Sequence, residues 1–97
     1  MALEQLQQFS GNLVILTAGA VAADNGVMDY NFDEAQIARA MLQRAARKIV
    51  LCDSSKFGNN APFVVSRLDE IDDLVCEQAP AGLLSENLRD ARVNVIY

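Results

Sequence analysis

The chain alternates between short, continuous apolar runs and longer stretches in which apolar residues recur with helical period. Continuous runs are typical of strands covered on both faces, and the runs at 13–16 and 49–52 are of this kind. Shorter apolar runs at 63–65 and 74–76 and the closing segment 93–97 are also strand-like. The pattern therefore predicts a protein built on several short strands.

The clearest helix is predicted to begin after Asn31, because Asn31 can cap it and Glu34 stands three residues later in a capping-box arrangement. Its apolar face repeats with helical period: Ile37, Ala38, Met41, Leu42 and Ala45. A short helix is predicted over 2–9. Another is predicted to start near Pro80, with an apolar stripe made of Leu83, Leu84, Leu88 and Ala91.

Strand, helix, strand is repeated along the chain, which is the order of an α/β domain. It predicts a mostly parallel sheet flanked by helices, as in Rossmann-like proteins. In open sheets of this kind, ligands bind beyond the carboxyl ends of the strands. Two segments leave such ends, 17–31 and 53–60, and the first is predicted to be a loop because it holds the turn signal Asp24-Asn25-Gly26. A binding site is expected in these two segments.

The charge of the chain is acidic, with 13 Asp and Glu against 8 Lys and Arg and a net charge of −5. A surface that binds nucleic acid needs basic residues to neutralise phosphates. The basic cluster Arg44, Arg47 and Lys48 falls at the predicted end of the helix, where cations complement the helix dipole. We therefore expect this chain not to bind DNA by itself.

Two cysteines, Cys52 and Cys76, lie in apolar runs, where a thiol behaves as a small buried hydrophobe. The chain has no histidine and no CxxC spacing, so no metal site, cofactor or catalytic residue is predicted. No apolar stretch is long enough to span a bilayer, and no signal peptide is evident. These features indicate a cytoplasmic protein without a membrane partner.

The segment 53–58, Asp-Ser-Ser-Lys-Phe-Gly, follows a predicted strand and carries the strongest candidate chemistry. From this position Lys56 can pair with a phosphate or carboxylate, and serine hydroxyls and loop amides can add donors. The alternative is that Asp53 organises an ordinary turn and Lys56 is simply solvated.

The other segment offers further candidates. Asp29 and Asn31 can hydrogen-bond the hydroxyls of a sugar, although Asn31 is equally explained as a helix cap. Glu34 has the same two interpretations, a capping acid or a carboxylate facing the site. Gly19 would let a ligand approach the backbone closely.

Several segments together carry a resemblance: 18–21 (Ala-Gly-Ala-Val), 25–28 (Asn-Gly-Val-Met), 34–41 (Glu-Ala-Gln-Ile-Ala-Arg-Ala-Met) and, most specifically, 52–58 (Cys-Asp-Ser-Ser-Lys-Phe-Gly). They resemble the C-terminal sensor domain of DeoR-family bacterial transcriptional repressors. The resemblance implies a fold like that of ribose-5-phosphate isomerase and a phosphorylated sugar as effector. It favours Lys56 as an anion contact.

The same resemblance implies that residues 1–97 are the C-terminal part of a sensor domain. Operator DNA would then be bound only by a winged helix-turn-helix outside this chain, and the protein is expected to form homo-oligomers. An isomerase-like enzyme with Glu34 as base is an alternative. However, no acid stands at 17–20, where the resemblance places an acidic loop of the isomerase. An oligomerisation module is a third hypothesis.

Overall fold

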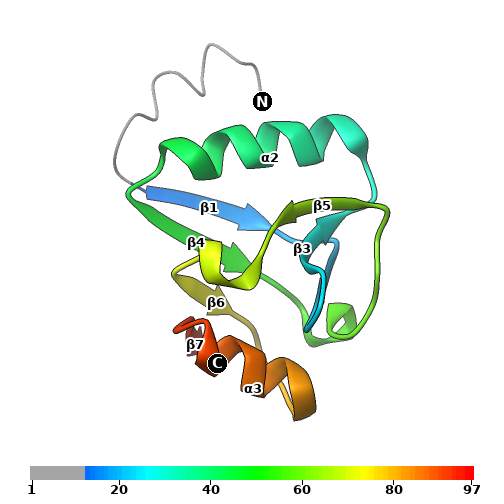
Figure 1. The fold of residues 1–97 in the computed structure, drawn as a ribbon, viewed down its shortest axis with the longest axis vertical. Coiled ribbons are helices and arrows are strands. Elements are labelled where there is room, and N and C mark those ends of the chain that lie inside the picture. The colour runs from blue at the N-terminus through cyan, green and yellow to red at the C-terminus, as the bar shows by residue number, and fades with distance from the viewer. Residues whose placement is uncertain (1–12) are drawn as a thin grey trace.

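The computed structural model describes residues 13–97, so the helix predicted over 2–9 lies outside the described residues. A parallel sheet has the strand order β1-β4-β6-β7. Its strands are β1 (Leu13–Thr17), β4 (Arg47–Leu51), β6 (Asp73–Val75) and β7 (Asn94–Ile96). The predicted α/β fold with a mostly parallel sheet is confirmed (Figure 1).

A second, antiparallel sheet has the order β2-β3-β5. It consists of β2 (Ala20–Ala22), β3 (Gly26–Asp29) and β5 (Phe63–Ser66). The prediction of a loop over 17–31 was therefore wrong, because this segment forms the β2–β3 hairpin. Gly26 makes the turn with φ 76°, and a Cβ there would lie 2.3 Å from the carbonyl oxygen of Ser66.

Helix α2 (Phe32–Arg44) begins as predicted, with the Asn31 side chain accepting a hydrogen bond from the Glu34 amide at 3.0 Å. The capping box is only half formed, because the Asn31 amide donates to Asp29 Oδ1 and not to Glu34. Arg47 and Lys48 lie on β4 and not in the last helical turn, so only Arg44 complements the dipole there.

Helix α3 (Gly82–Asp90) starts two residues after Pro80 and buries Leu84 and Leu88. It ends in a Schellman motif, in which Arg92 adopts the left-handed conformation with φ 62°. The Arg92 amide donates to Arg89 O, and the Val93 amide donates to Leu88 O, both at 3.0 Å. This turn leads the chain directly into β7. Two short 3-10 turns complete the fold, η1 (Ser54–Lys56) and η2 (Leu68–Glu70).

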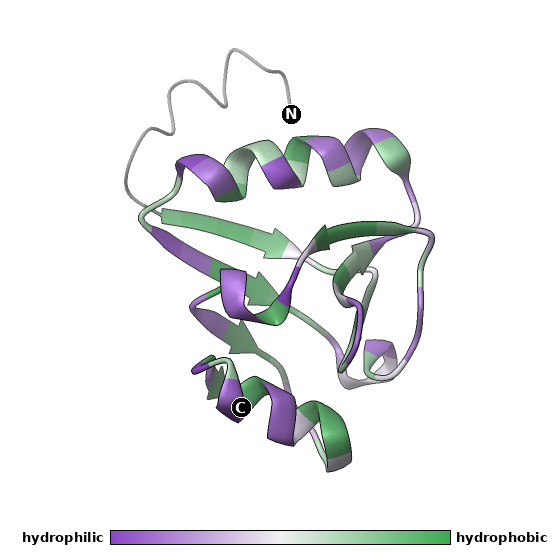
Figure 2. Ribbon diagram, in the orientation of Figure 1, coloured by the Kyte–Doolittle hydropathy of each residue, from purple (hydrophilic) through white to green (hydrophobic). Residues whose placement is uncertain are grey.

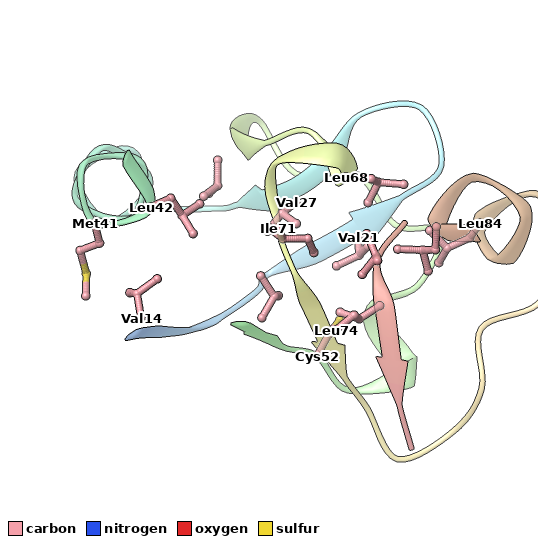
Figure 3. Packing of buried hydrophobic residues seen from close by; sticks show 14 of the residues in the cluster. Val14, Val21, Val27, Met41, Leu42, Cys52, Leu68, Ile71, Leu74 and Leu84 are labelled. Atoms are coloured by element: carbon pink, nitrogen blue, oxygen red, sulfur yellow. The ribbon is translucent and has the colours of Figure 1, made fainter. Parts of the chain in front are cut away.

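The main core lies between one face of the parallel sheet, the small sheet and both helices (Figure 3). Val14, Val50 and Leu74 point into it from neighbouring strands and are almost completely buried. Figure 2 shows β1 as apolar along most of its length, yet Leu13 is 43% exposed and Ile15 is 52% exposed. The prediction that the 13–16 strand is covered on both faces is wrong for the described residues.

One polar cluster stands at the start of β4, β6 and β7. Asp73 is 3% exposed and accepts two hydrogen bonds from the Arg47 guanidinium, at 2.9 and 2.7 Å. It also accepts one from Asn94 Nδ2 at 3.1 Å. Hydrogen bonding to Arg47 holds the pKa of the Asp73 carboxyl below its ordinary value, so the acid is charged at neutral pH.

Candidate functional site

A cleft of about 620 Å³ opens where the parallel strands end. Its walls come from the ends of β1, β4 and β6, which lie side by side because Thr17, Leu51 and Val75 are in register. Nine residues line it: Thr17, Ala18, Leu51, Cys52, Asp53, Lys56, Val75, Cys76 and Glu77. The cleft lies where ligands are bound in open parallel sheets.

The Asp53–Gly58 loop forms one wall of the cleft. Asp53 Oδ1 accepts a hydrogen bond from the Ser55 amide at 3.1 Å and so caps the short turn η1. This hydrogen bond is the main reason why the pKa of Asp53 is lowered. The Gly58 amide, with φ 77° at that residue, donates to Val21 O at 2.8 Å and ties the loop to β2. Asp53 thus organises a turn, as the simpler interpretation predicted, and also lines the cleft.

Lys56 is half-buried in the same wall. Between residues 13 and 97 there are two salt bridges, Arg47–Asp73 and Arg67–Asp69, and neither involves Lys56. Its ammonium group is the one cation among the residues that line the cleft. Asp53 and Glu77 add two carboxylates to the same walls. The cleft therefore combines one unpaired cation with several hydrogen-bond acceptors.

Glu77 is a site residue that the sequence analysis missed. It follows β6, and its two carboxylate oxygens accept both donors of Ser54, the amide at 2.8 Å and the hydroxyl at 2.7 Å. These hydrogen bonds, first that of the hydroxyl, lower the pKa of Glu77. The strand-end rule that selected Asp53 would also have found Glu77 if it had been applied to the 74–76 strand.

The remaining predicted site residues form a separate group at the start of α2. Asp29 caps Asn31, and Asn31 caps Glu34, through the two hydrogen bonds described above. Gly19 packs against this group, since a Cβ on it would lie 3.1 Å from the Tyr30 ring and 3.3 Å from Asp29 Cα. In the described part of the chain, no side-chain hydrogen bond or salt bridge joins this group to Asp53 or Lys56.

Cys52 and Cys76 are both free and buried. Burial raises the pKa of Cys52 to about 11, so at neutral pH this residue is a thiol and not a reactive thiolate. Within residues 13–97, no three His, Cys, Asp or Glu side chains are grouped so that they could hold a metal ion. No helix in this part of the chain has the length and apolarity needed to cross a bilayer.

Comparison with known proteins places this chain in a family. One relative, from Escherichia coli O157:H7, is named as a candidate aga operon transcriptional repressor. It is 35% identical over 94 residues, which are 96% of this chain and 35% of that protein. The glycerol-3-phosphate regulon repressor of Haemophilus influenzae is 28% identical over 80 residues, 82% of this chain and 31% of that protein.

A third relative, the transcriptional repressor AccR of Agrobacterium fabrum, is 30% identical over 85 residues, 87% of this chain and 33% of that protein. The chain thus spans about a third of the length of these curated relatives. The family described as the DeoR C terminal sensor domain matches residues 1–78, which include the Asp53–Gly58 loop and Glu77. The chain therefore belongs to the family of DeoR C-terminal sensor domains.

Proposed function

We propose that the chain senses a phosphorylated sugar for a transcriptional repressor of carbohydrate metabolism. The observation that carries this proposal is Lys56, which lines a cleft at the strand ends and forms no salt bridge with any of residues 13–97. A lysine ammonium is a suitable point charge for a phosphate. Carboxylates such as that of Asp53 accept hydrogen bonds from sugar hydroxyls. The names of two relatives, a glycerol-3-phosphate regulon repressor and an aga operon repressor, support the same class of function.

The second group of residues is proposed to bind the sugar from the hairpin side. Asp29 and Asn31 would contact hydroxyls, Gly19 would leave room for the ligand, and Glu34 would face it from the start of α2. Residues 1–97 would be the C-terminal part of the sensor domain. Operator DNA would be bound by a separate winged helix-turn-helix, and the whole protein would act as a homo-oligomer.

Thermal shift and isothermal titration with a panel of sugar phosphates test the proposal. At least one phosphorylated sugar should raise the melting temperature and bind, while the same sugar without its phosphate should bind much more weakly. Lys56→Ala should abolish the difference between the two, because it removes the cation of the cleft. Lys48→Ala is a matched control, since Lys48 is also half-buried but lies near the opposite end of β4.

Two results would refute the proposal. One is that no sugar phosphate in the panel binds to the chain or to the repressor that contains it. The other is that Lys56→Ala binds the sugar phosphate as tightly as the unchanged protein does. Equal losses in Lys56→Ala and Lys48→Ala would also count against it, because they would indicate a general charge effect and not a contact in the cleft.

A further inference from the structure

Glu77 occupies the donors that the loop would otherwise offer to a ligand. The Ser54 amide and hydroxyl both point at its carboxylate, at 2.8 and 2.7 Å. These are charge-assisted hydrogen bonds, because the Glu77 carboxyl, whose pKa they lower, is ionised at neutral pH. In the described structure Ser54 makes no other side-chain hydrogen bond.

An anion held by an amide and a hydroxyl beside a lysine is also how a protein loop holds a phosphate. Lys56 stands two residues after Ser54 in η1 and lines the same cleft as Glu77. The carboxylate of Glu77, a group of the protein itself, thus occupies the donors that the anionic group of a ligand would require. The carboxylates of Glu77 and Asp53 both line this cleft, and each would repel an incoming phosphate.

We propose that Glu77 is an internal substitute for the anionic group of the effector, and that the effector displaces it. This inference rests on the proposed function. As a phosphate binds to Lys56, the Ser54 amide and hydroxyl transfer their hydrogen bonds from Glu77 to the phosphate oxygens. The Glu77 carboxylate is then released and becomes hydrated, since Glu77 is already exposed to solvent.

The displacement would give the sensor a mechanical response. The Glu77–Ser54 pair connects the end of β6 to the loop after β4. Directly before this loop, the Cys52 amide donates a hydrogen bond to Val75 O at 2.9 Å. This bond does not involve Glu77, so β4 and β6 stay paired when Glu77 is displaced. Binding would therefore loosen the two loops relative to each other and leave the sheet intact. Such a change is of the kind that can shift a regulator between two states.

Binding of inorganic phosphate to the 97-residue chain, measured by isothermal titration, tests this inference. Glu77→Ala should bind phosphate about tenfold more tightly than the unchanged chain, because it removes one competing anion and frees two donors. Glu77→Gln should show a smaller gain, since its side-chain oxygen still accepts one hydrogen bond. In Ser54→Ala/Glu77→Ala most of the gain should be lost, because the hydroxyl donor is missing.

Glu70→Ala is the matched control. Glu70 is also an exposed glutamate, and its Oε1 accepts a backbone hydrogen bond from the Arg67 amide at 2.7 Å, but it lies in η2 and not in the cleft. It should not change phosphate affinity. Equal or weaker binding by Glu77→Ala than by the unchanged chain would overturn the inference, since Glu77 would then hold the loop in its binding conformation.

A second measurement uses only the unchanged chain, so its result does not depend on whether a variant folds. In the unchanged chain, titration with phosphate should shift the ¹³C resonance of the Glu77 carboxylate and the amide resonance of Ser54 together. A shift at Lys56 without any shift at Glu77 would contradict displacement and leave the proposed function standing. If phosphate moves none of these resonances and no sugar phosphate binds, the inference and the proposed function both fail.

Discussion

The two faces of the parallel sheet carry similar side chains but have different surroundings. On the inner face, Val50 and Leu74 are 0% exposed and pack under the helices and the small sheet. On the outer face, large aliphatic side chains stay exposed by 38 to 52%: Leu13, Ile15, Leu51 and Ile96. Among residues 13–97, both helices pack against the inner core and neither covers the outer face.

The strand order explains the difference. From β1 through β4 and β6 to β7, each new strand is added on the same side of the previous one. Crossover connections between parallel strands are almost always right-handed, so successive steps in one direction place every connection on the same face. An apolar run predicts a strand, but it does not say which way the chain winds and so which face is covered.

Leu74→Ala should have the largest effect, because it removes a buried side chain from the inner face. We expect a loss of about 2–5 kcal/mol in the free energy of unfolding, from lost burial and from the cavity that remains. Urea denaturation followed by circular dichroism measures it. Leu13→Ala makes the same chemical change on the outer face and should cost much less. Equal losses would contradict the distinction between the faces.

Asp73→Asn tests the buried polar residue that lies on the outer face of the sheet. It should cost less than Leu74→Ala but more than changes at exposed aliphatic residues, because Arg47 loses its ionic partner while the shape is kept. A double-mutant cycle with Arg47→Met measures the coupling by urea denaturation. Additive effects of the two changes would show that the ion pair contributes nothing to stability.

The pH dependence of stability should report the same ion pair. Because Arg47 holds the pKa of Asp73 below its ordinary value of 3.8, the unfolded chain takes up a proton at higher pH than the folded protein does. The stabilisation is therefore complete above the ordinary pKa and is lost as the pH falls through the lower, folded value. The difference in unfolding free energy between the unchanged chain and Asp73→Asn should shrink in this range. If this difference stays constant down to the lowest pH at which both proteins fold, the ion pair does not contribute to the pH dependence of stability.

Ile15→Thr should have the smallest effect. Ile15 is 52% exposed, and threonine is as suitable for a strand as isoleucine, so we expect a change of at most about 0.5–1 kcal/mol. Val50→Thr is the inner-face control and should cost more, because it buries a hydroxyl without a partner. A large loss in Ile15→Thr, measured by the same denaturation, would mean that the outer face is covered in solution.

The parts of the fold that depend on near neighbours could be predicted from the sequence. The cap of α2 joins Asn31 to Glu34, three positions apart, and the turn at Asp53 uses the amide of Ser55. The β2–β3 hairpin could not be predicted in this way. Its strands are short and partly made of alanine, and β3 is stabilised by pairing with the distant β5, where Val27 faces Ser66.

The residues of the candidate site also divide into those that a local pattern predicts and those that depend on tertiary pairing. Lys56 and Asp53 were found because they directly follow a recognisable strand. The contact of Glu77 with Ser54 depends on β6 lying next to β4, which is a tertiary pairing.

The predicted apolar stripe of α3 was correct for Leu84 and Leu88 but not for Leu83, which is 62% exposed. Helical period alone does not set the width of the buried stripe.

The sequential strand order β1-β4-β6-β7 also has a consequence for the kinetics of folding. Each parallel strand pairs with the strand that precedes it in this sheet, so every pair closes a loop of comparable length. The closure entropies then differ by less than about 0.5 kcal/mol. No pairing has to wait for a much longer loop to close, so the sheet can grow one strand at a time from either edge. The order of assembly is then decided by which unit first buries enough apolar surface.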